Sequence, residues 1–205
     1  NRTDGTDRDN EKNKTNMTDG TNKTNMKIME NENLAKYMTF RIGGDARYFC
    51  EVENVEELKE ALKFAKEKGI PYFILGGGSN VVADDEGYGG IVIKMKYDKL
   101  KILDIYDEYD KWDKYIEAGA GVSLAKVVSE CEKNELIGME WAWGIPGTVG
   151  GAVRGNAGAY GGEIKDSIEL VTVLRGGELI ELKNEDCKFG YRESVFKKNG
   201  DIVLG

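Results

Sequence analysis

The clearest hydrophobic pattern along the chain is a helical one. In residues 55–68, apolar side chains recur every three or four positions with Lys and Glu between them, which predicts one amphipathic helix. Asn54 suits the N-cap of this helix, with Glu57 three residues further on. Gly69 can end the helix, and Pro71 forbids its continuation.

Two short apolar runs predict buried strands next to this helix. Residues 72–75 read as a strand that leads directly into the glycines at 76–78, and residues 91–95 read as a second strand after a glycine-rich turn. Helix and strands together predict a βαβ-like lobe at roughly residues 33–100.

The second half of the chain predicts another mixture of helix and strand. Residues 97–116 are rich in Asp, Lys and Tyr and predict one or two exposed strands. Ser123 suits the N-cap of a helix whose apolar face includes Leu124 and Cys131. Residues 167–175 and 178–182 alternate around a Gly-Gly pair, as expected of a hairpin. We therefore expect a second α+β lobe at 101–205.

The first 32 residues differ in composition from the rest. Residues 1–27 contain no Leu, Ile, Val, Phe, Trp or Tyr and repeat short Thr-, Asn- and Asp-containing motifs. Such a stretch buries too little apolar surface to offset the entropy lost on ordering. We expect a disordered, low-complexity tail over 1–32.

Charge and composition exclude several classes of function. The net charge of −8 argues against nucleic acid or anionic lipid as the main partner. The sequence contains no apolar run long enough to span a membrane and no secretory signal, which predicts a cytoplasmic location. The three cysteines have no metal-ligand spacing, and the absence of histidine excludes imidazole bases and histidine metal sites in this segment. We expect no metal site and three packed, reduced thiols.

Two glycine-rich segments are the strongest candidates for a binding site. Glycines directly after a strand, as at 76–80, allow backbone N–H groups to converge on an anion, although a simple tight turn is an equally good explanation of this segment alone. The segment is neither a Walker A loop nor a dinucleotide fingerprint. Residues 144–162 hold eight glycines in nineteen residues. So many glycines are entropically costly, and a flat, extended ligand lying against backbone explains them together.

Four segments in order resemble one enzyme family. Residues 39–46 (TFRIGGDA), 75–80 (LGGGSN), 144–163 and 190–197 (GYRESVFK) are similar in order and spacing to the UDP-N-acetylmuramate dehydrogenases, also called UDP-N-acetylenolpyruvoylglucosamine reductases. The resemblance covers about residues 33–205. The residues at 81–83 and 154–155 depart from the family pattern, which bears on how the substrate side of the site is built and not on membership of the family.

The resemblance implies a vanillyl-alcohol-oxidase type (PCMH) FAD-binding fold of class α+β, with FAD between two lobes. Because the segment has no histidine to carry a flavin link, FAD is expected to be non-covalent. The resemblance implies that residues 76–80 hold the pyrophosphate and that the second segment lines the rest of the cofactor. The cofactor-binding residues that the resemblance implies are Gly76, Gly77, Gly78, Ser79, Asn80, Gly144, Ile145, Pro146, Gly147, Thr148, Gly150, Asn156, Ala157, Gly158 and Ala159.

Arg192 is the residue that the resemblance implies for chemistry. A planar, permanently charged guanidinium suits the enolpyruvyl carboxylate of a UDP-sugar substrate and the negative charge that develops during its reduction. Tyr191 is expected to contact the substrate or orient Arg192, and Ser194 to act as a local hydrogen-bonding group. Outside this family motif, an arginine in such a setting is more often a surface ion pair.

The resemblance also implies NADPH as electron donor, and a serine acid and a glutamate in a C-terminal domain that lies beyond Gly205. We expect this chain to be a truncated product that does not complete a turnover. Two alternatives stay open: another oxidoreductase of the same FAD superfamily, and a non-catalytic flavin-binding module. The sequence carries no signal for oligomeric state.

Overall fold

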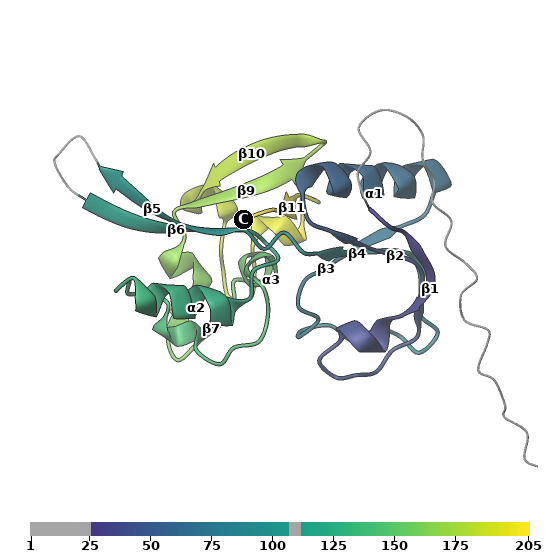
Figure 1. Cartoon of the computed structure of the whole chain (residues 1–205), viewed down its shortest axis with the longest axis horizontal. Coiled ribbons are helices and arrows are strands. Elements are labelled where there is room, and N and C mark those ends of the chain that lie inside the picture. The colour runs from purple at the N-terminus through teal and green to yellow at the C-terminus, as the bar shows by residue number, and fades with distance from the viewer. Residues whose placement is uncertain (1–25, 107–111) are drawn as a thin grey trace, which may run out of the picture.

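The computed structural model describes residues 26–106 and 112–205, which form two α+β lobes side by side (Figure 1). Each lobe contains both helices and strands, which confirms the expected α+β fold class. The helices and strands are β1 (Met29–Asn33), β2 (Asp45–Val52), α1 (Val55–Lys68), β3 (Tyr72–Leu75), β4 (Tyr88–Met95), β5 (Leu100–Tyr106), β6 (Trp112–Ala118), α2 (Leu124–Lys133), α3 (Val149–Gly155), β7 (Gly158–Ala159), β8 (Gly162–Glu163), β9 (Leu170–Arg175), β10 (Glu178–Lys183) and β11 (Ile202–Val203). Five short 3-10 helices connect them: η1 (Leu34–Tyr37), η2 (Glu140–Ala142), η3 (Ile164–Ser167), η4 (Asn184–Cys187) and η5 (Val195–Lys197).

The first lobe is a four-stranded sheet in the order β1-β2-β4-β3, with α1 on one face. Strands β2 and β3 both run parallel to β4, and β1 is antiparallel to β2. Successive residues of β2 point to opposite faces: Cys50 packs in the cluster with Leu58 of α1, whereas Phe49 packs with Leu34 of η1. The sheet is thus covered on both faces, which fixes its register.

Helix α1 has the predicted bounds and caps. The side chain of Asn54 accepts a hydrogen bond from the backbone N–H of Glu57 at 2.9 Å, and Glu57 accepts one from the N–H of Glu53 at 2.8 Å. Gly69 ends the helix in the left-handed conformation, with φ 63°.

Ordered structure begins earlier than the sequence predicts. The expected tail ran to residue 32, but Met29–Asn33 forms β1. Backbone pairing explains the difference, because Met29 is in register with Phe49 and the edge of β2 supplies hydrogen bonds that composition cannot reveal. Residues 1–25 of the expected tail lie outside the described residues.

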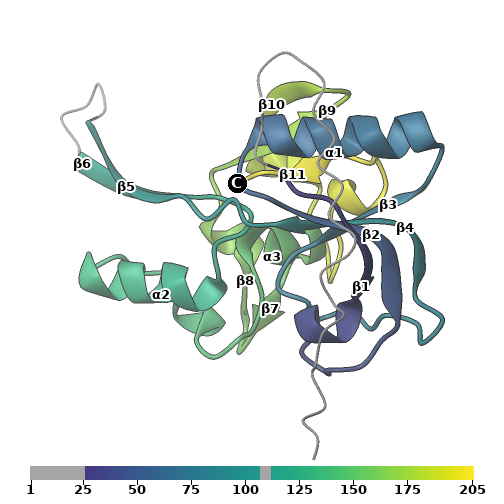
Figure 2. The same ribbon diagram turned by 45° about the vertical axis from the view of Figure 1, so that its right-hand side comes forward.

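The second lobe has a three-stranded antiparallel sheet, β10-β9-β11, the helices α2 and α3, and the β5–β6 hairpin, which extends away from the body (Figure 2). Ser123 caps α2 as predicted, accepting from the N–H of Lys126 at 3.2 Å. The β9–β10 hairpin is also confirmed, but β9 begins at Leu170 rather than Ser167. Residues Ile164–Ser167 instead form η3, stabilised by a capping box between Glu163 and Asp166.

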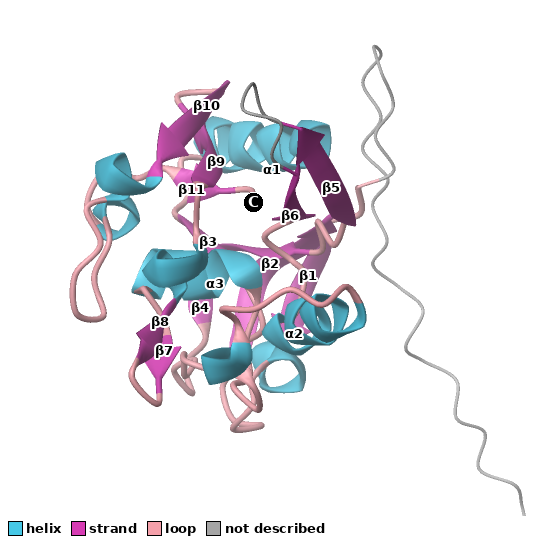
Figure 3. Ribbon diagram, turned by 90° about the vertical axis from the view of Figure 1, so that its left-hand side faces the viewer, coloured by secondary structure: helices cyan, strands magenta, loops and turns pink. Residues whose placement is uncertain are grey.

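The lobes share apolar packing. Leu174 of β9, Ile202 of β11 and Leu204 belong to the same buried cluster as α1, β2 and β4. A separate cluster between α2, α3 and the β9–β11 sheet forms the core of the second lobe, and Phe196 and Val153 are fully buried in it. Figure 3 shows α1 along one side of β2 and β3, and α3 next to β7 and β8 of the second lobe. Within the described residues, no helix has the length and apolar character needed to cross a membrane.

Candidate cofactor and substrate site

The two glycine-rich segments of the sequence meet in the structure. Residues 76–80 follow β3 of the first lobe, and residues 144–148 precede α3 of the second. The hydroxyl of Ser79 donates a hydrogen bond to the carbonyl oxygen of Pro146 at 3.1 Å. A Cβ added to Gly77 would lie 3.2 Å from Cα of Gly147, so the two segments approach closely at a point where a side chain on Gly77 would press on the second segment.

Gly78 holds the first segment against η1. Its φ of +69° lies in the left-handed region, and an added Cβ would overlap the carbonyl oxygen of Tyr37. The carbonyl oxygen of Gly78 also accepts a hydrogen bond from the N–H of Thr39 at 3.0 Å. The loop after β3 is therefore fixed on both sides.

Lys94 of β4 places a positive charge behind this loop. Its Nζ donates to the carbonyl oxygen of Gly76 at 3.0 Å and lies 5.7 Å from the centre of the Tyr37 ring. Burial lowers the pKa of Lys94, and the charge of Lys96 lowers it further. Sequence reasoning missed this residue, although one lysine inside the apolar run 91–95 was a usable signal.

Thr148 offers a buried hydroxyl to a ligand at the same place. Among the residues that the structure describes, its Oγ1 is one of two buried side-chain polar atoms without a hydrogen-bond partner, the other being Nε1 of Trp141. A buried hydroxyl without a partner is costly, and an oxygen-rich ligand would relieve the cost. Thr148 Oγ1 lies 2.5 Å from the position of a Cβ on Gly76. Glycine backbone, a free hydroxyl and a nearby cation fit a phosphate-containing cofactor.

The other predicted cofactor residues occupy varied environments. Gly150 packs so closely that an added Cβ would lie 2.7 Å from Cβ of Ala120. Gly158 and Ala159 form β7, and Ala157 uses its N–H within the chain, on the carbonyl oxygen of Ala152. Asn156 is fully buried. Their roles toward a cofactor stay predictions, as do those of the remaining loop residues Asn80, Gly144 and Ile145.

Arg192 lies in a tight turn beside the second segment. Its Nη2 donates to the carbonyl oxygen of Gly158 at 2.8 Å, and its Cζ lies 5.8 Å from the centre of the Tyr191 ring. Arg192 and Tyr191 are both exposed, Tyr191 at 86%. Ser194 is buried and donates to the carbonyl oxygen of Arg154 at 2.7 Å, the local role that the sequence predicts. The turn therefore presents a cation at the surface next to β7.

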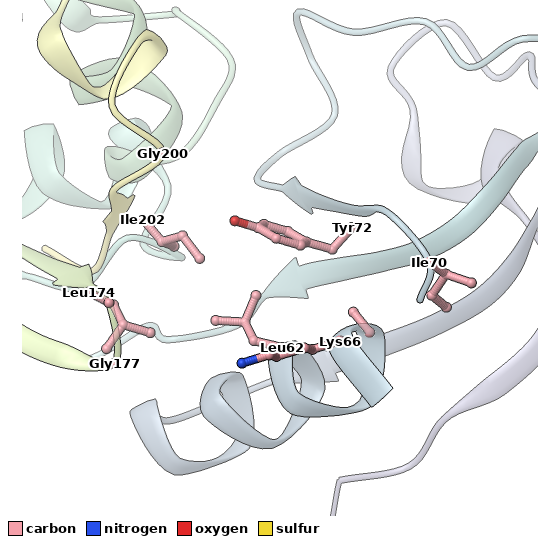
Figure 4. Close-up of a pocket in the computed structure, with 10 residues that line it drawn as sticks. Leu62, Lys66, Ile70, Tyr72, Leu174, Gly177, Gly200 and Ile202 are labelled. Carbon is pink, nitrogen blue, oxygen red and sulfur yellow. The ribbon is translucent and has the colours of Figure 1, made fainter. Parts of the chain in front are cut away.

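A separate pocket of about 390 Å³ is lined by residues of both lobes (Figure 4). Its apolar wall includes Leu62 of α1 and Leu174 of β9. The hydroxyl of Tyr72 and the ammonium of Lys66 point toward the end formed by Gly177 and Ile202. None of the residues predicted for cofactor or substrate lines this pocket.

Residues 46–183 match the model of a protein family described as the FAD binding domain. The chain belongs to this FAD-binding family. The match spans both glycine-rich segments, so they lie within the FAD-binding domain.

Two curated relatives share one name. The chain is 41% identical over 180 residues to the UDP-N-acetylenolpyruvoylglucosamine reductase of Clostridioides difficile, which covers 86% of this chain and 56% of the relative. It is 40% identical over 179 residues to that of Clostridium tetani, covering 86% of this chain and 55% of the relative. The chain thus spans a little more than half of the length of these relatives.

Solved structures agree with the expected fold. The crystal structure of UDP-N-acetylenolpyruvylglucosamine reductase from Thermus caldophilus is similar with a TM-score of 0.68 at 34% identity, over 87% of this chain and 59% of that one. A VAO-type flavoprotein from Myceliophthora thermophila is similar in fold alone, with a TM-score of 0.56 at 17% identity over 78% of this chain and 31% of that one. The vanillyl-alcohol-oxidase type of fold is confirmed.

Proposed function

We propose that this chain is the FAD-binding part of a UDP-N-acetylenolpyruvoylglucosamine reductase. That enzyme uses NADPH to reduce UDP-N-acetylglucosamine enolpyruvate to UDP-N-acetylmuramate, a step in making peptidoglycan precursors. The observation that carries the proposal is the hydrogen bond from Ser79 to Pro146, which joins the two glycine-rich segments into one cradle. The identity of 41% to a reductase of that name supports the choice of reaction.

The cradle accounts for cofactor binding. Gly77 has no Cβ to push Gly147 away, so the two glycine-rich segments meet here, and Lys94 Nζ, 3.0 Å from the carbonyl oxygen of Gly76, adds positive charge to the cradle. We assign the pyrophosphate of FAD to this position, with the unpaired hydroxyl of Thr148 as a further donor. With no histidine in the chain, binding is non-covalent.

Arg192 accounts for recognition of the substrate. FAD held in the cradle would supply the hydride chemistry, with NADPH as the electron donor. The guanidinium of Arg192 holds the enolpyruvyl carboxylate and stabilises the negative charge that develops on the substrate, for which a planar cation with several donors is well suited. Tyr191, exposed and stacked near Arg192, is placed to contact the same group.

Two parts of the proposal reach beyond the described site. The resemblance implies a serine acid and a glutamate in a C-terminal domain, and this chain spans 56% of the Clostridioides difficile relative, so the complete reaction is proposed for a full-length enzyme of this family. A cytoplasmic location and a small-molecule substrate, with neither nucleic acid nor membrane as partner, belong to the same proposal.

Titration of the purified chain tests the proposal in two steps. FAD is added first, and binding is followed by quenching of flavin fluorescence. UDP-N-acetylglucosamine enolpyruvate is then added to the FAD-loaded chain, and the change in flavin absorbance is recorded for the wild type and for Arg192→Ala. We expect saturable FAD binding, and a substrate-induced change that is weakened at least tenfold in Arg192→Ala. A chain that binds FAD but gives the same substrate titration with and without Arg192 would contradict the assignment of the reaction.

A further inference from the structure

Asn156 ends α3 and is completely buried, at 0% exposure. Its Nδ2 donates to Oε2 of Glu163 at 3.1 Å and to the carbonyl oxygen of Gly190 at 2.8 Å. Its Oδ1 accepts from the backbone N–H of Lys165 at 3.3 Å. Both N–H bonds of the amide are thus used inside the protein, and neither is left for a cofactor.

Glu163 decides which way this amide points. Lys165 and Asn156 hold the pKa of Glu163 below its usual range by hydrogen bonding, and the charge of Arg192 adds to the effect. An ionised carboxylate only accepts hydrogen bonds, so the NH₂ group of Asn156 must face it. The second N–H of that group then reaches Gly190, at the start of the turn that carries Arg192.

The turn that carries Arg192 needs outside support. Gly190 and Glu193 exchange two backbone hydrogen bonds, at 3.0 and 3.1 Å, around it. Arg192 itself has φ +53°, a left-handed conformation that is unfavourable for a residue with a Cβ and persists only where the surroundings impose it. Asn156 is a buried side chain that donates a hydrogen bond to the carbonyl oxygen of Gly190, the first residue of this turn.

Two further bonds fix the same turn to the second glycine-rich segment. Ser194 donates to the carbonyl oxygen of Arg154, and Arg192 donates to that of Gly158. Figures 2 and 3 show α3 beside β7 and β8, the segments that supply these partners. The end of α3, β8 and the Arg192 turn therefore form one hydrogen-bonded unit centred on Asn156.

We propose that Asn156, oriented by Glu163, is a positioning residue that holds the Arg192 turn in place rather than a contact to the cofactor. The proposal rests on the proposed function only where Arg192 is taken to bind the substrate carboxylate. Loss of the Asn156 side chain should make the turn more mobile and weaken substrate binding by Arg192, while the affinity for FAD stays the same.

The first experiment measures the turn itself. Asn156→Gly removes the side chain but keeps a residue that tolerates φ +42°, which protects the fold. The matched control is Asn134→Gly, because Asn134 also donates its Nδ2 to a backbone carbonyl, that of Glu130, at the end of α2. We expect the amides of Gly190 and Glu193 to exchange hydrogen about tenfold faster in Asn156→Gly and at the wild-type rate in the control. Unchanged exchange at these amides would overturn the proposal.

The second experiment asks whether Asn156 acts through Arg192. In the FAD-loaded chain, UDP-N-acetylglucosamine enolpyruvate is titrated against wild type, Asn156→Gly, Arg192→Ala and the double variant. We expect Asn156→Gly to weaken ligand binding about tenfold in the wild-type background and less than twofold in the Arg192→Ala background. The affinity for FAD should change by less than about threefold. Additive losses, or loss of FAD binding in Asn156→Gly, would overturn the proposal. If wild type itself binds no ligand, the proposed function fails while the exchange measurement still decides the role of Asn156.

Discussion

The hydroxyl of Ser79 and the carbonyl oxygen of Pro146 are 3.1 Å apart and hydrogen-bonded, although 67 positions separate them along the chain. This bond connects the loop after β3 in the first lobe with the segment before α3 in the second. A ligand held by both segments would lie at the junction of the lobes. Because the contact involves backbone and small side chains, substitutions here should affect the ligand more than the core.

Gly77→Val should weaken FAD binding by at least tenfold. A branched Cβ at this position would press on Gly147, 3.2 Å from the Cβ position, and would move the two segments apart. Gly89→Val in β4 is the matched control, because a Cβ there would meet nothing within 4 Å. Fluorescence titration with FAD compares the two variants, and equal affinities would place the cofactor elsewhere.

Lys94→Met should lower the affinity for FAD and for ADP, but not for riboflavin, which has no phosphate. The Lys94 ammonium bonds to Gly76 O from the buried side and adds positive charge where the pyrophosphate is proposed to lie. Lys96→Met is the control, since Lys96 pairs with Glu51 at 3.8 Å and is about half exposed. A parallel loss of riboflavin affinity would indicate that Lys94 only supports the fold of the loop.

Arg192→Ala, in a full-length enzyme that contains this chain, should slow reduction of the proposed enolpyruvyl substrate by ~10²–10³, the usual effect of losing one preorganised donor. Reduction of FAD by NADPH should change little, because the charge that Arg192 stabilises forms only on the substrate. Anaerobic stopped-flow absorbance separates the two half-reactions. An equal loss in both would assign Arg192 to flavin positioning instead.

The three cysteines should be unreactive in the folded chain. All three are buried free thiols, and burial raises the pKa of Cys187 to about 11 and that of Cys50 to about 12. At pH 8 the reactive thiolate is therefore scarce in both. A thiol-specific chromogenic reagent should titrate fewer than one thiol per chain in buffer and three in denaturant. Rapid reaction of Cys50 in buffer would contradict its placement between α1 and the sheet.

Local patterns in the sequence were enough to predict α1, α2, β3 and the β9–β10 hairpin, because caps, turn glycines and hydrophobic periodicity are all short-range signals. The strand β1 was missed because it is polar, and only its pairing with β2 makes it a strand. The helix α3 was also missed, since three of its seven residues are glycine and its stability comes from buried Val149, Ala152 and Val153.

For the site, too, local features could be predicted from the sequence and tertiary contacts could not. The two glycine-rich segments could be found from composition and resemblance, but their contact at Ser79 and Pro146 depends on how the lobes pack. Sequence similarity placed Asn156 among the cofactor residues, which stays a prediction, and it gave no sign that the amide bonds to Glu163, Gly190 and Lys165. Which polar groups a buried side chain satisfies is a tertiary property, and no spacing rule gives it.

The most direct test of the central claim is a fluorescence titration of the purified, flavin-free chain with FAD, with ADP as competitor and riboflavin as comparison. The account predicts saturation at one FAD per chain, displacement of FAD by ADP, and much weaker binding of riboflavin. The reason is that residues 76–80 and 144–148 are proposed to bind the pyrophosphate, which riboflavin lacks. Failure to bind FAD, or equal binding of FAD and riboflavin without competition by ADP, would contradict it.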